Sequence, residues 1–257
     1  MPAPNASKHL PLVSIIVRTV DRPYYLRECL TSLLVQDYPN IEIIIVNDGG
    51  ESVSALVEEL GLPFRHQLIE LKENRGRSEC GNIGLDHASG KYIGFIDDDD
   101  IFYSFHISTL VYKLINSNYK VVYSDGLQAR QIKCPFNDKM YSTVELTLVL
   151  SEEFDFQDLL TRNYIPILCA LFDRCCIEEG IRFDTSMDVL EDWDFWIRIA
   201  RHYDFAHLKQ ITCEYRYRSD GSNTVGQLDH VWEWCRNHIK HKYSILRKGR
   251  VNMELAS

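Results

Sequence analysis

The chain has 257 residues, of which 45% are hydrophobic and 25% charged, as in a soluble globular protein and unlike a disordered one. Its net charge of −9 argues against a nucleic-acid-binding protein, because neutralising phosphates requires clustered Lys and Arg. No apolar run is long enough to span a bilayer, and the start, MPAPNASKHLPL, lacks the basic and apolar blocks of a secretion signal. We therefore predict a cytoplasmic protein.

The first hundred residues alternate between apolar runs and amphipathic stretches. Strands are predicted at 12–17, 41–46, 64–71 and 91–96, and helices at 21–34, 51–60 and 78–88. Strands that alternate with helices indicate βαβ units. The sequence thus predicts an α/β fold with a mainly parallel central sheet flanked by helices.

The pattern is looser after about residue 101. Helices are predicted at 107–116, 174–180, 192–202 and 229–246, and strands at 120–125 and 165–172. The segment from 128 to 153 is polar and irregular, and we assign it no element. No linker or repeat interrupts the chain, so we predict one domain over 1–257, with lobes at about 10–125 and 126–225 and a C-terminal helix at about 226–257.

The eight cysteines form no C-x-x-C pair, so we predict buried, reduced thiols, with a disulfide framework as the alternative.

Polar residues follow three of the predicted strands. They are Arg18-Thr19 after the first, Asn47-Asp48 after the second, and the run Asp97 to Asp100 after the fourth. Ligands of parallel sheets bind at the carboxyl ends of the strands, where these clusters lie. Solvated loop ends would explain any one cluster, but they explain all three poorly.

The four adjacent carboxylates of the run repel one another, so a cation or water must lie against them. Aspartate oxygens suit Mg²⁺ or Mn²⁺, which often bridge to substrate phosphates. The alternative is a turn with solvated acids. The spacing of a calcium loop is absent.

Five segments occur in the order seen in a known family. They are SIIVRTVDRP (14–23), VNDGG (46–50), ENRG (73–76), GNIGLDHASGKYIGFIDDDD (81–100) and LEDWDFWIRIA (190–200). Together they resemble the family 2 glycosyltransferases, which are inverting, nucleotide-sugar-dependent enzymes of the Rossmann-like GT-A fold. The resemblance covers roughly 12–220. It implies a nucleotide-sugar-binding lobe at about 10–125 and a smaller acceptor-side lobe at about 126–225.

The resemblance also implies roles for residues of the donor site. Asp48 is expected to accept a hydrogen bond from a uracil-type base, with Thr19 lining the same pocket. The acidic run matches the family's DxD motif, which makes Asp99 the ligand of a Mn²⁺ or Mg²⁺ ion. Asp97 and Asp98 are then expected against the ribose and the donor sugar. A bound divalent cation would neutralise the charge of the leaving diphosphate.

Asp192 matches the catalytic base of the family. A carboxylate within hydrogen-bond reach of the acceptor hydroxyl can remove its proton, which typically contributes about 10²–10⁴-fold. An acid in the first turn of a helix also stabilises the helix dipole, which is the structural alternative. Glu191, Trp193 and Trp196 are assigned to acceptor binding, although tryptophans at helical spacing also serve as core residues.

Two positions depart from the family pattern. Gly81 stands where an Arg is common, and Arg77, one turn earlier on the same helix, could supply the missing charge. Arg218 stands where many members have a His that binds metal or phosphate. Because a guanidinium suits two diphosphate oxygens but cannot bind a metal, we assign Arg77 and Arg218 to the donor.

These features predict a transferase that moves a sugar from a UDP-sugar to a glycan, lipid-linked or protein-linked acceptor. One alternative is a protein without activity, either a degenerate glycan- or nucleotide-binding module or the partner subunit of a transferase. The other is a sugar nucleotidyltransferase, which would need a glycine-rich loop after the first strand, and VRTVDRP contains no glycine. The basic stretch from Arg236 to Arg250 could make a peripheral contact with the inner face of the membrane, although such stretches are usually solvated. The sequence leaves open whether the chain also contacts a second copy of itself in a homo-oligomer.

Overall fold

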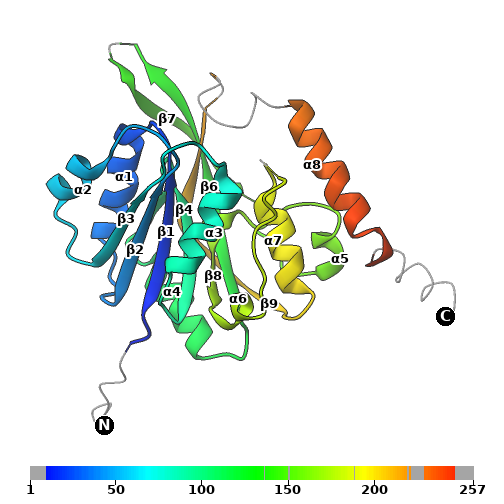
Figure 1. Ribbon diagram of the computed structural model, residues 1–257. Helices are drawn as coiled ribbons and strands as arrows, with labels where there is room; N and C mark the ends of the chain where they lie inside the picture. The colour runs from blue at the N-terminus through cyan, green and yellow to red at the C-terminus, as the bar shows by residue number, and fades with distance from the viewer. Residues whose placement is uncertain are drawn as a thin grey trace, which may run out of the picture.

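A computed structural model describes residues 10–135, 137–149, 151–187, 189–218, 220 and 229–246. Within these ranges the strands form one curled nine-stranded sheet with helices on both faces (Figure 1). The strands are β1 (Val13–Thr19), β2 (Ile41–Asn47), β3 (Arg65–Glu70), β4 (Tyr92–Asp97), β5 (Ile101–Phe102), β6 (Val121–Cys134), β7 (Asn137–Val149), β8 (Ala170–Asp173) and β9 (Phe205–Arg218). The helices are α1 (Pro23–Leu34), α2 (Ser54–Leu60), α3 (Arg77–His87), α4 (His106–Ile115), α5 (Phe156–Leu159), α6 (Cys175–Glu178), α7 (Glu191–Ala200) and α8 (Asp229–Lys242), with a 3₁₀ turn at Ile167–Cys169.

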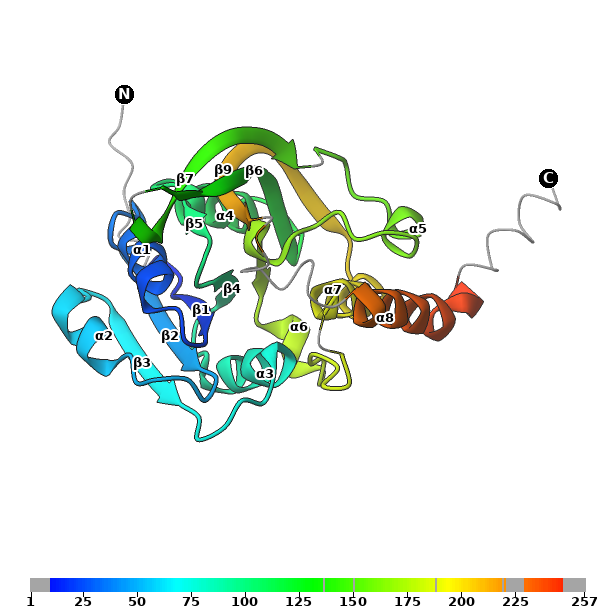
Figure 2. The ribbon, with the colours of Figure 1, turned by 90° about the horizontal axis from the view of Figure 1, so that it is seen from above.

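The N-terminal half of the sheet is parallel, in the order β3-β2-β1-β4. All seven residues of β1 and of β2 are buried, as expected for parallel strands that are covered on both faces. One face packs against α1, α2 and α4, and the other against α3 and α7 (Figure 2). The α/β class and the alternation of strands and helices are confirmed.

The C-terminal half of the sheet is mixed. Strand β8 runs antiparallel to both β4 and β6, while β9 runs parallel to β6 and antiparallel to β5. The strand predicted at 165–172 is shorter, because the 3₁₀ turn occupies its first part and β8 covers only Ala170–Asp173.

The segment at 128–153, which received no assignment, is largely a hairpin of β6 and β7. Its sequence TVELTLV alternates polar and apolar residues, which is the pattern of a strand with one face in water. The apolar side chains Val144, Leu146 and Leu148 are about half exposed. They do not belong to the buried core, whereas the strands that were predicted from apolar runs do.

Helix α8 packs beside α7 (Figures 1 and 2). Cys235 and Ile239 are fully buried, and the Tyr243 hydroxyl donates to Asp194 Oδ1 at 2.8 Å. In the described part of the chain, no helix has the length and apolar character needed to cross a membrane. Part of the basic stretch, 247–250, lies outside the described residues. All eight cysteines are free thiols.

Candidate active site

The three predicted polar clusters meet at one edge of the sheet. Strands β1, β2 and β4 are parallel and end together, with Arg18 in register with both Val46 and Asp97. The Thr19 hydroxyl donates to Asp98 Oδ2 at 2.7 Å, which ties the end of β1 to the acidic run. The sheet therefore gathers the ends of these three strands into one site.

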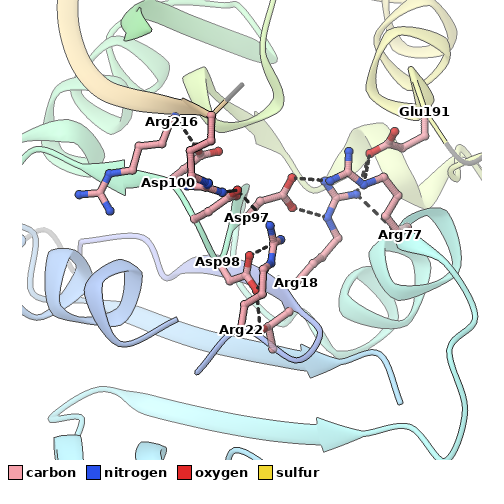
Figure 3. Close-up of polar contacts among 11 residues, drawn as sticks. Arg18, Arg22, Arg77, Asp97, Asp98, Asp100, Glu191 and Arg216 are labelled. Carbon is pink, nitrogen blue, oxygen red and sulfur yellow. Dashed lines mark hydrogen bonds and ion pairs between the residues drawn. The ribbon is translucent and has the colours of Figure 1, made fainter. Parts of the chain in front are cut away.

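Arginines hold the first two aspartates of the run (Figure 3). Asp97 Oδ1 accepts from Arg18 Nε at 2.8 Å, and Asp97 Oδ2 accepts from Arg77 Nη2 at 3.2 Å. Arg22 forms an ion pair with Asp98 and also donates to it through Nε at 3.2 Å. The repulsion between adjacent carboxylates is thus offset by guanidinium groups from β1, from the residue directly before α1, and from α3.

Asp99 and Asp100 are also engaged. Asp99 Oδ2 accepts from Arg22 Nη1 at 3.0 Å and from the buried guanidinium of Arg218. Asp100 Oδ1 accepts from the backbone N–H of Arg216 at 2.9 Å, which joins the run to β9.

Burial and charge push the pKa values within the run in opposite directions. Burial alone would raise the pKa of Asp97, but Arg18 and Arg77 outweigh it and lower that pKa to about 2. Burial raises the pKa of Asp98 to about 7, an effect that Arg22 opposes and the charge of Asp99 reinforces. Burial also raises the pKa of Asp100. The arginines therefore favour the ionised form of Asp97, whereas burial favours the protonated forms of Asp98 and Asp100.

Asp99 was predicted to bind a metal ion, and its surroundings fit that role poorly. One of its carboxylate oxygens already accepts from two guanidiniums. In the ranges that the structure describes, no three His, Cys, Asp or Glu side chains converge on a point where they could hold an ion. The described protein groups alone therefore do not form an ion site, and Mg²⁺ would need water and substrate phosphates to complete its about six oxygen ligands.

Asp192 lies in the first turn of α7. Both of its carboxylate oxygens lie 3.1 Å from the side-chain amide nitrogen of Asn163, and the backbone N–H of Trp193 donates to Oδ1 at 2.8 Å. Burial and the neighbouring Glu191 raise the pKa of Asp192 to about 7, against the hydrogen bond from Asn163. The carboxylate is held in one orientation and titrates near neutrality, as a general base requires.

The acidic run and α7 are joined directly. Arg18, which bonds Asp97, donates through Nη1 to Glu191 Oε1 at 3.0 Å, and Arg77 Nε lies 3.7 Å from the same oxygen (Figure 3). Glu191 is 2% exposed. Glu191 therefore connects α7 to the strand ends through these two arginines. Its side chain also lines the adjoining cavity.

A cavity of about 480 Å³ opens between these groups. Five predicted site residues line it, namely Arg77, Asp97, Glu191, Asp192 and Trp193. Further lining comes from residues 161–164 and 166–168, from Tyr215 on β9, and from Trp232 and Arg236 on α8. A carboxylate that titrates near neutrality and a charged sheet edge thus face one space, in which a sugar could bind.

Asp48 has a structural task at the same edge. Its carboxylate accepts from the backbone N–H groups of Arg75 at 2.6 Å and Gly76 at 3.0 Å, and its side chain is buried. Asp48 therefore fixes the loop before α3, and its contact with a nucleotide base stays a prediction.

The family model described as "Glycosyl transferase family 2" matches residues 14–173. The chain belongs to this family. It is 30% identical over 266 residues to "Uncharacterized glycosyltransferase RP339" of Rickettsia prowazekii (strain Madrid E), with 96% of this chain and 78% of that protein covered. It is 29% identical over 85% of its length to a longer uncharacterized glycosyltransferase of Rickettsia bellii (strain RML369-C), and it spans about a third (32%) of that relative.

Solved glycosyltransferases share the fold. TarS 1–349 of S. aureus, in complex with UDP-GlcNAc, gives a TM-score of 0.64 at 17% identity and covers 90% of this chain and 71% of that one. The mannosyltransferase PcManGT from Pyrobaculum calidifontis, in complex with GDP-Man and Mn²⁺, gives 0.61 at 20% identity over 83% of this chain and 59% of that one. The GT-A fold is therefore confirmed.

Two of the residues predicted for the glycosyltransferase site are buried and do not line the cavity. Trp196 is fully buried, and its ring nitrogen donates to the Ile165 carbonyl at 2.9 Å, so it is a core residue and the prediction of an acceptor contact is wrong. Arg218 is also fully buried, with its guanidinium 4.3 Å from the centre of the Tyr25 ring. It supports Asp99 and does not face open space, so the predicted contact between Arg218 and a donor is corrected as well.

Two residues of the site escaped prediction. Arg22 forms part of the quoted motif VRTVDRP, and its place at the start of a helix after the first strand was the available signal. Asn163 lies in a part of the chain without periodicity, and nothing in the sequence marks it as the partner of Asp192.

Proposed function

We propose that the protein is an inverting glycosyltransferase that moves a sugar from a UDP-sugar to a hydroxyl of a glycan, lipid-linked or protein-linked acceptor. The observation that carries the proposal is the position of Asp192 on the same cavity as Asp97 and Arg77. The complexes of the two structural neighbours with UDP-GlcNAc and GDP-Man support a nucleotide-sugar donor.

The reaction would be a single displacement at the anomeric carbon, through an oxocarbenium-like state. Asp192 would accept the proton of the acceptor hydroxyl while the bond to the diphosphate breaks. Asn163 holds both carboxylate oxygens and so limits the rotation of the base. A pKa of about 7 leaves a large fraction of Asp192 ionised at neutral pH while keeping it basic enough to take the proton.

The leaving diphosphate needs positive charge nearby. The side chains of Arg22 and Arg77 are 24% and 30% exposed, whereas the other two arginines of the network are buried. We assign Arg22 and Arg77 to the diphosphate, and Thr19, Asp48, Asp97 and Asp98 to the nucleoside and the donor sugar. A guanidinium can donate to two phosphate oxygens at once, which suits this role.

The prediction of Mn²⁺ or Mg²⁺ at Asp99 has support from the Mn²⁺ complex of PcManGT. A bound ion would act as a Lewis acid on the diphosphate. Because the protein groups around Asp99 do not form an ion site by themselves, we derive no step through the ion. Calorimetric titration of UDP in EDTA and again in Mn²⁺ measures what the metal contributes to binding.

A screen of nucleotide sugars for UDP release, followed by transfer to candidate glycans, tests the function. We expect turnover with one UDP-sugar and loss of at least 100-fold in Asp192→Asn. UDP binding without turnover of any sugar would instead favour a glycan- or nucleotide-binding module. Asp158→Asn is the matched control, because Asp158 is an exposed carboxylate outside the cavity.

A further inference from the structure

Helix α8 contributes to the cavity although it lies beyond the family match at 14–173. Trp232 and Arg236 are four residues apart, so they share one face of the helix, and both line the cavity that Asp192 lines. They share this cavity with the proposed base, which is where an acceptor would lie if the donor occupies the strand ends.

The wall that α8 forms is fixed to the helix that carries Asp192. The Tyr243 hydroxyl donates to Asp194 Oδ1 at 2.8 Å, and Lys242 Nζ lies 2.7 Å from Asp184 Oδ2 and 2.8 Å from Asp194 Oδ1. Cys235 and Ile239 anchor the same helix in the core. A ligand bound against α8 would therefore be held at a defined position relative to the base.

The arginines that line the cavity differ in their partners. Arg18 and Arg77 are paired with Asp97 and Glu191, and Arg162 is paired with acids outside the cavity. Arg236 is exposed and makes no ion pair with any residue that the structure describes. A cation at a cavity wall that has no ion-pair partner in the described part of the chain can bind an anionic group of a ligand.

Trp232 offers a second kind of contact. Its side chain is partly buried, and its ring nitrogen has no hydrogen-bond partner within the described ranges. Pro166, Ile167 and Leu168 also line the cavity. An indole beside apolar neighbours gives a sugar ring a flat surface, and its N–H can donate to a hydroxyl.

We propose that Trp232 and Arg236 bind an acceptor saccharide that carries an anionic group, either a carboxylate or a phosphate, with the indole against the sugar ring and the guanidinium on the anion. This inference rests on the proposed function. It adds the chemical class of the acceptor and the two residues that select it.

The test measures binding to the full chain saturated with UDP, using matched pairs of ligands. One pair is p-nitrophenyl β-glucuronide and p-nitrophenyl β-glucoside, and the other is glucose 6-phosphate and glucose. We expect at least one anionic sugar to bind ten-fold or more tightly than its neutral partner. The better pair identifies the anion as carboxylate or phosphate.

Variants assign the effect to α8. Arg236→Gln should abolish the preference for the anion, and Trp232→Ala should weaken both members of the pair at least ten-fold. Trp234→Ala is the control, because Trp234 is 51% exposed, stacks on His238 and does not line the cavity. A preference that survives in Arg236→Gln, equal binding within both pairs, or an equal effect of Trp234→Ala would overturn the inference. UDP affinity, measured separately, reports whether the variants fold, and its absence in the unaltered protein would instead refute the proposed function.

Discussion

Replacing Asp192 with Asn removes the proposed base while keeping the size of the side chain. General-base catalysis contributes about 10²–10⁴-fold, so kcat should fall by a factor in that range. The hydrogen bond from the Trp193 backbone can be retained by the Asn oxygen, so UDP affinity should not change.

The pKa of about 7 gives this prediction a pH signature. In the unaltered protein, kcat/KM should rise about ten-fold per pH unit below pH 7 and level off above it, because only the ionised carboxylate accepts a proton. Asn163→Ala removes a hydrogen bond that lowers this pKa, so the midpoint should move to higher pH. In Asp192→Asn the residual activity should lose this rise.

The same pKa predicts an effect on stability. The unfolded chain ionises Asp192 near pH 4, whereas the folded chain keeps it protonated until about pH 7. The fold therefore loses stability as the pH rises between these values, by about 1.4 kcal/mol per unit at most. Because Asp192 is partly exposed, we expect a total of roughly 2–4 kcal/mol. Asn cannot ionise, so Asp192→Asn should gain stability over the unaltered protein between pH 5 and pH 8.

The assays are UDP release at saturating donor from pH 5.5 to 8.5, and urea unfolding at pH 5 and pH 8. Three results would refute the reasoning about Asp192: a flat pH profile in the unaltered protein, more than a tenth of the activity in Asp192→Asn, or a stability difference between the two proteins that does not grow with pH.

Three further predictions concern the stability of the fold. Gly49→Ala should destabilise the fold by roughly 1–3 kcal/mol in urea unfolding, because φ is +74° and a Cβ would lie 2.3 Å from a backbone carbon. Gly61→Ala is the control, because a Cβ at Gly61 meets open space, and it should destabilise the fold less. Arg218→Gln should lower the unfolding free energy by about 3–5 kcal/mol in thermal unfolding, because it removes a positive charge beside the buried carboxylate of Asp99. The exposed ion pair of Arg27 and Glu59 is the control and should contribute less than about 1 kcal/mol. Trp196→Phe should lower the unfolding free energy by about 1–3 kcal/mol and leave the KM for the acceptor unchanged. A large change in that KM would show that Trp196 does contact the acceptor.

The sequence predicted the parts of the site that local patterns determine. Apolar runs identified the parallel strands, and the rule that ligands bind at their carboxyl ends placed Asp48 and the run from Asp97 correctly along one edge. It could not predict the partners of the acids, because Arg22 directly precedes α1 and Arg218 ends β9, and only the folded chain brings these places together. The same local patterns left the status of Trp196 open, because a helical stripe of aromatic residues fits both a core and a ligand surface.

The arginine network explains how four adjacent aspartates are stable in a folded protein. Arg18, Arg77 and Arg218 come from β1, α3 and β9, and Arg22 directly precedes α1. The repulsion within the run is therefore compensated only once these four places are brought together. Breaking one buried pair leaves an uncompensated charge, which costs more than the pair itself contributes.

This arrangement also separates two tasks among the arginines. Arg18 and Arg218 are 5% and 0% exposed and hold the carboxylates, whereas Arg22 and Arg77 are more exposed and remain partly open to a ligand. On the proposed function, an arriving diphosphate would compete with Asp97 and Asp98 for the two open guanidiniums. Because Asp98 already titrates near neutrality, it can take up a proton when Arg22 turns to the phosphate, so that the site need not bury an unpaired negative charge. UDP binding should therefore be accompanied by proton uptake near pH 7, which calorimetry in buffers of different ionisation enthalpy can measure.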